Sequence, residues 1–96
     1  QQLDTNYDVP SLSIKKHNLQ ILKKAIEAVW GQSVEDRELS TLTIAINKKD
    51  LDFVKSRIRD FKYKLDKDLI ERSKSREPDG VYCLAIQFFN LLENRS

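Results

Sequence analysis

Apolar residues recur at helical spacing near the start of the chain, between Pro10 and Gly31. The pattern predicts a helix from Ser11 or Ser13, either of which can act as its N-cap, to Trp30. Gly31 stands where a glycine commonly follows a helix. Six apolar residues fall within an arc of about 100° and predict the face that packs on the core. They are Leu12, Leu19, Leu22, Ile26, Val29 and Trp30.

The same helix carries a second apolar stripe, which a small domain has less surface to cover. Two interpretations stay open: both stripes are buried within this chain, or the second one contacts another subunit or a neighbouring domain. The predicted subunit contact consists of Ile14, Asn18, Ile21, Ala25 and Ala28.

Two later segments have the pattern of β-strands, and a long amphipathic helix separates them. Residues 39–46 alternate with one strongly apolar face, whereas Val81–Leu91 is apolar on both faces, as in a covered central strand. Between them, apolar positions at intervals of three and four predict a helix from about Lys48 to Ser73, with Asn47 as its cap. A short helical turn or loop is expected at 33–37.

This order predicts an α/β fold (α+β possible) of helix, strand, helix and strand, in which the long helix forms a crossover between parallel strands. Two strands alone are marginal in water, so we expect a second subunit or the N-terminal tail to complete the small sheet. Residues 1–9 are expected to be a linker or an edge segment, and residues 10–96 a single domain. Because the chain has no methionine and opens on Gln1, we expect a processed product or a fragment of a longer protein.

Composition excludes several classes of function. Lys and Arg number 17 against 15 Asp and Glu, which is too balanced for a dedicated nucleic-acid surface. One cysteine excludes an internal disulfide and fits a reducing compartment, so the expected location is cytoplasmic. No uncharged stretch reaches the length of about 18 residues that a membrane span needs. Two glycines exclude a Gly-rich phosphate loop, and no cofactor is expected.

The few residues with reactive side chains favour structural roles. His17 has no partner at catalytic spacing, and Cys83 is expected to be a buried structural thiol. Asp66, Asp68 and Glu71 do not share one helical face, so they predict a solvated surface rather than a metal site. We therefore expect no catalytic residue and no enzyme activity.

The strongest charged feature is a basic segment within the long predicted helix. It consists of Lys55, Arg57, Arg59, Lys62 and Lys64. On a helix these side chains flank the apolar stripe on both sides, which is typical of solvated flanks. The alternative is a nucleic-acid-binding module that uses Lys55–Lys64, with Phe53 and Tyr63 available for stacking.

Four stretches of the chain together resemble one family. They are His17–Ala25, Glu35–Ile44, Ile58–Phe61 and Val81–Leu91. The chain resembles the C-terminal domain, of unknown function, of uncharacterised bacterial transcription regulators that carry an upstream winged helix-turn-helix part. The family usually ends this motif with Phe-Pro-Leu, where this chain has Phe89-Asn90-Leu91.

The resemblance implies no catalytic residue and implies regulation only by analogy. We expect a non-enzymatic regulatory or dimerisation domain that forms a homodimer. DNA is expected to bind through the upstream part rather than through this chain.

Overall fold

The computed structural model describes residues 11–92 and contains two long helices, α1 (Leu12–Gly31) and α2 (Leu51–Arg72). Two short 3-10 helices, η1 (Val34–Asp36) and η2 (Lys48–Asp50), follow α1 and precede α2. The predicted segment 1–9 lies outside the described residues.

Local sequence signals account for both long helices. Ser11 occupies the N-cap position of α1, but its side chain makes no capping hydrogen bond. Gly31 is the last helical residue, and the extended Gln32 ends the helix. At the other helix Asn47 caps the η2 turn: its side-chain oxygen accepts a 2.9 Å hydrogen bond from the backbone N–H of Lys49. The predicted helices and the Asn47 cap are therefore confirmed, each helix to within a few residues.

The α/β prediction is wrong. Within residues 11–92 the regular structure is helical, with no strand, no sheet and thus no crossover between parallel strands. Residues 39–46 and 81–90 run as extended chain, and no backbone hydrogen bond joins them in the described part of the molecule. Alternating and β-branched residues favour extended backbone, but a strand also needs a neighbouring segment that bonds to it, and residues 11–92 bring none into place.

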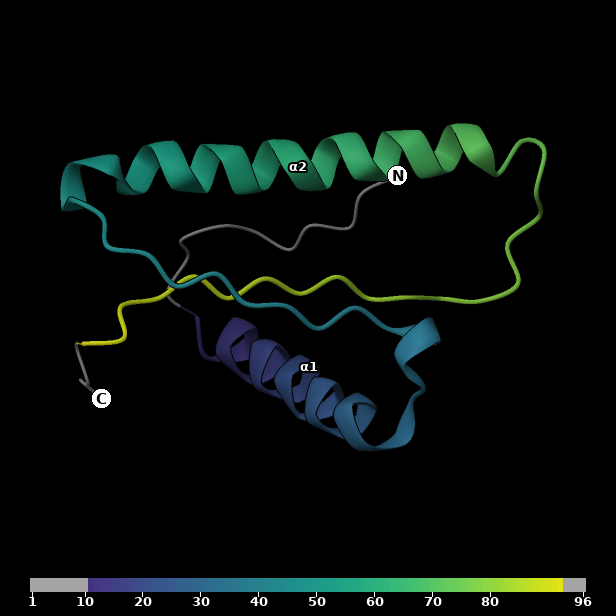
Figure 1. Ribbon diagram of the computed structural model, residues 1–96, viewed down its shortest axis with the longest axis horizontal. Coiled ribbons are helices and arrows are strands. Elements are labelled where there is room, and N and C mark those ends of the chain that lie inside the picture. The colour runs from purple at the N-terminus through teal and green to yellow at the C-terminus, as the bar shows by residue number, and fades with distance from the viewer. Residues whose placement is uncertain (1–10, 93–96) are drawn as a thin grey trace.

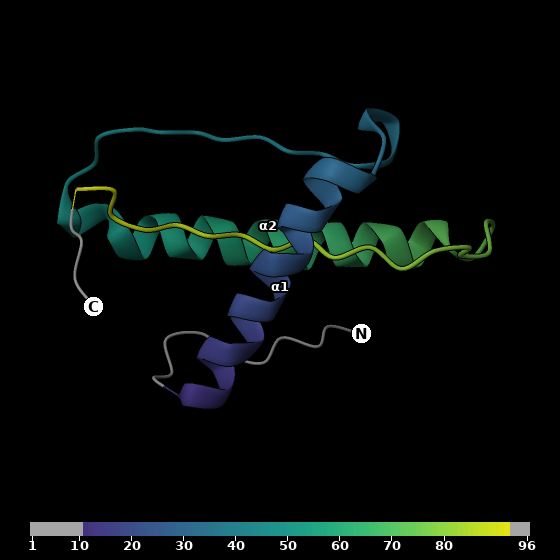
Figure 2. The same ribbon diagram turned by 90° about the horizontal axis from the view of Figure 1, so that it is seen from below.

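The elements form three layers (Figure 1). α2 lies on one side, the two extended segments lie in the middle, and α1 lies on the other side. Both extended segments run in the same direction and opposite to α2, and Figure 2 shows them apart, with 81–90 passing along α2. α1 crosses this arrangement steeply (Figure 2) and makes no contact with α2 among the described residues.

Candidate functional site: an exposed apolar surface

No side chain is buried anywhere in residues 11–92. The whole chain exposes 9548 Å², whereas a compact monomer of 11.2 kDa exposes about 5,700 Å². Its radius of gyration is 15.6 Å, against about 12.5 Å for a compact domain of this length. The apolar side chains that a small domain normally buries are therefore largely on the surface.

The two faces of α1 are the reverse of what the sequence suggests. The larger stripe, which was expected to pack on the core, is exposed along its whole length, with Trp30 at 86%. The smaller stripe is half-buried at Ile14, Ile21 and Ala28, while Asn18 and Ala25 are exposed. The predicted subunit contact thus includes the better covered face of α1, and the large apolar stripe is the one without cover.

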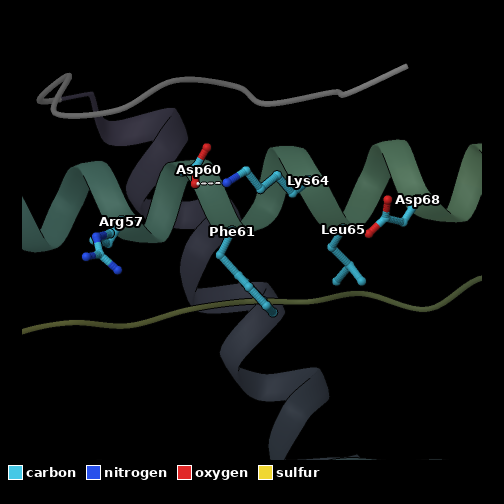
Figure 3. Close-up of a pocket in the computed structure, with 6 residues that line it drawn as sticks. All are labelled: Arg57, Asp60, Phe61, Lys64, Leu65 and Asp68. Atoms are coloured by element: carbon cyan, nitrogen blue, oxygen red, sulfur yellow. Dashed lines mark ion pairs between the residues drawn. The ribbon is translucent and has the colours of Figure 1, made fainter.

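The apolar stripe of α2 faces the extended layer. Leu51, Val54, Ile58 and Leu65 are half-buried, and Phe61 remains 54% exposed. Figure 3 shows Phe61 and Leu65 pointing from the helix toward the segment of residues 81–90. These two apolar residues line a shallow groove together with four charged ones, Arg57, Asp60, Lys64 and Asp68.

The apolar side chains of the extended segments are as exposed as the large stripe of α1. Leu42 is 81% exposed and Tyr82 is 77% exposed. Leu84, Ile86 and Phe88 each retain more than a third of their accessible surface, so neither face of this segment is covered as a central strand would be. Cys83 is exposed, so the expectation of a buried thiol is wrong for the single chain.

The basic residues of α2 divide between two flanks, as the helical spacing predicts. Lys55, Arg59 and Lys62 lie on one flank, where they are half-buried and each has an interaction. Arg57 and Lys64 lie on the opposite flank.

On that second flank each cation has a partner. The guanidinium of Arg57 lies 5.0 Å from the centroid of the Phe53 ring, and Lys64 Nζ lies 2.9 Å from Asp60 Oδ2. The five basic residues therefore do not gather into one surface.

The remaining candidates for chemistry stay apart. His17 is exposed on α1. No group of three or more His, Cys, Asp or Glu residues is placed to hold a metal ion within the described part of the chain, and this includes Asp66, Asp68 and Glu71. Neither helix there combines the length and the apolar character that crossing a bilayer requires.

Sequence reasoning identified the apolar residues of this surface but missed that they are exposed together. Alternation showed which faces are apolar, whereas the lack of cover is a property of the whole chain. The one signal that could have revealed it is the number of apolar faces: two on α1 and two on 81–90, more than two helices can cover.

Comparison with known protein families assigns the chain to one family. The chain belongs to the family described as domain of unknown function DUF4423, whose sequence pattern matches residues 1–91. No curated protein and no solved structure matches it.

Proposed function

We propose that this domain is a non-enzymatic regulatory or dimerisation domain of a bacterial transcription regulator, and that it works in the cytoplasm as a homodimer. The observation that supports the proposal is the uncovered apolar surface formed by α1, α2 and the two extended segments. One whole chain, with the residues outside 11–92 included, exposes about 3,900 Å² more than a compact monomer of its mass. An obligate dimer buries about 1,000–2,500 Å² on each partner, so this surface is large enough for such an interface.

Dimerisation supplies a mechanism of regulation. A regulator that reads a two-fold symmetric DNA site needs two DNA-binding parts at fixed spacing. A domain that holds two chains together sets that spacing, and a signal that weakens the pairing lowers the affinity for DNA. In this proposal the winged helix-turn-helix part of the regulator contacts DNA, and this domain does not.

Sedimentation equilibrium of the 96-residue chain from low to high micromolar concentration tests the pairing. The expected result is a particle with twice the mass of one 11.2 kDa chain, in reversible equilibrium at the lowest concentrations. A monomer that persists at high micromolar concentration contradicts the proposal.

A reporter assay tests the link to regulation. The domain is fused to a DNA-binding domain that represses its operator only as a dimer, and repression is compared with that of the unfused DNA-binding domain. Restored repression supports the proposal. A fusion that accumulates normally but does not repress contradicts it.

A further inference from the structure

Among residues 11–92 the backbone of the two extended segments has no backbone partner. No backbone–backbone hydrogen bond involves residues 38–46 or 77–90 within the described part of the chain. Backbone N–H and C=O groups that leave water need partners, and the apolar side chains on these segments favour leaving water. A partner that covers this surface must therefore also supply backbone hydrogen bonds.

The partner that fits is a second copy of the same chain. We infer that two copies interlock, each placing its segment 81–90 between segments 39–46 and 81–90 of the other. This inference specifies the contact of the dimer proposed above and rests on that proposal. Residues 11–92 of the single chain form no ladder, so the pairing inferred here forms between copies.

Symmetry gives the directions of the pairing. Segments 39–46 and 81–90 of one copy run in the same direction in both views (Figures 1 and 2). A two-fold axis perpendicular to their layer reverses the segments of the second copy. The inserted segment is then antiparallel to both of its neighbours, and both α2 helices lie on one side of the layer.

The residues of the two segments fit these positions. Segment 81–90 has no charged residue, so two copies can lie against each other without like-charge repulsion. It is apolar on both faces, as a central position between two helical layers requires. Segment 39–46 places Thr41 and Thr43 on its less apolar face, which suits an outer position.

Other occupants fit less well. A partner of different sequence would have to match an uncharged apolar segment that is complementary to itself under two-fold symmetry. A second copy supplies that segment, and the same contact covers apolar surface on both chains at once.

Proline at Gln87 tests the backbone pairing. Proline removes the N–H of this residue and is excluded from central paired positions, but it is compatible with unpaired extended backbone. We expect Gln87→Pro to raise the dissociation constant of the dimer by about 100-fold or more, and the matched Gln87→Ala to change it by less than about 10-fold. A Gln87→Pro dimer as tight as the Gln87→Ala dimer overturns the inference.

Disulfide trapping tests the symmetry. The series compares five proteins that each carry one cysteine: the parent chain with Cys83, and four variants in a Cys83→Ser background with the cysteine at 84, 85, 86 or 87. The control carries Ser75→Cys, beyond α2, in the same background. In an antiparallel two-fold pair, only residues at the axis face their own copies at about 5 Å between Cβ atoms. We expect cross-linking to peak at one or two adjacent positions and to fall away on both sides, with none at 75.

The outcomes separate the two proposals. A dimer without a cross-linking peak means that the copies pair elsewhere, which overturns the inference and leaves the dimerisation proposal standing. A monomer at high micromolar concentration overturns both.

Discussion

The extended segments are richer in apolar residues than the helices, and the two kinds of element also differ in where the partners of their backbone groups lie. α2 closes its backbone hydrogen bonds within its own 22 residues, and the η2 turn before it is capped by Asn47, which lies two residues from the N–H group that it accepts. Segments 39–46 and 81–90 have no backbone partner among residues 11–92, because an extended chain can bond only to another segment. Within residues 11–92 one chain completes its helices by itself and leaves its extended segments without backbone partners, which in the proposed dimer a second chain supplies.

The largest expected effect comes from a charge in the extended layer. Ile86→Asp places an unpaired carboxylate in segment 81–90, which the proposed dimer would shield from water. Burying such a charge costs several kcal/mol, so we expect no dimer at the concentrations at which the parent chain is fully paired. Sedimentation velocity and circular dichroism measure assembly and helix content.

The matched control is Gln20→Asp on the exposed polar side of α1, where the same carboxylate stays in water. Its effect should be within about 0.5 kcal/mol. If Ile86→Asp and Gln20→Asp assemble equally well, segment 81–90 stays in water and the comparison with the helices fails.

Two phenylalanines on α2 give the next largest difference. Phe61 points at segment 81–90 (Figure 3), whereas Phe53 lies under the guanidinium of Arg57 at the surface. If the second copy encloses Phe61, Phe61→Ala should lower the free energy of unfolding by about 3–5 kcal/mol, and Phe53→Ala by about 1 kcal/mol or less. Urea denaturation of both variants at one chain concentration measures this difference.

Equal losses for the two variants indicate that Phe61 stays as exposed in solution as in the single chain. Repeating the titration at a tenfold lower chain concentration provides a check, because the stability of a dimer depends on concentration and that of a monomer does not.

The sequence predicted the helices, whose hydrogen bonds are local, better than it predicted the pairing of the extended segments. The helix limits depend on local signals, and residues near Ser11, Gly31 and Asn47 indicated them to within a few positions. The extended backbone of 39–46 was also local information, because Thr41, Thr43, Ile44 and Ile46 favour it. The pairing of these segments depends on residues distant in sequence, so the pattern could not distinguish a parallel pair within the chain from two unpaired segments.

The two apolar faces of α1 show that local sequence patterns also could not predict which part of the candidate surface is exposed. Periodicity separates the stripe with Ile14 and Ile21 from the stripe with Leu19 and Ile26, but it does not say which stripe finds cover. Size suggested that the larger stripe is buried, and the structure exposes it. That choice depends on what lies opposite each face, which periodicity does not contain.

A smaller effect is expected at the start of α2. Asn47→Ala removes the side-chain oxygen that accepts from Lys49 N–H, while Asn47→Asp retains an acceptor there. Loss of such a cap typically costs about 1 kcal/mol, so Asn47→Ala should lower the midpoint of thermal unfolding and Asn47→Asp should leave it close to the parent value. Because the cap is local, neither variant should shift the monomer–dimer equilibrium as Gln87→Pro does.

The smallest effect is expected from the ion pair on the second flank of α2. Lys64 lies 2.9 Å from Asp60 one turn earlier, and the two side chains are 70% and 49% exposed. An exposed pair of this spacing contributes about 0.3–0.5 kcal/mol, and salt screens it. Lys64→Ala should therefore be less stable than Lys67→Ala, which removes another lysine from the same helix and changes the helix propensity equally. In 1 M NaCl the two variants should denature at the same urea concentration. A difference that persists in high salt would mean that the stem of Lys64 packs against the groove beside Phe61, and that this flank, like the extended layer, is covered by the second copy.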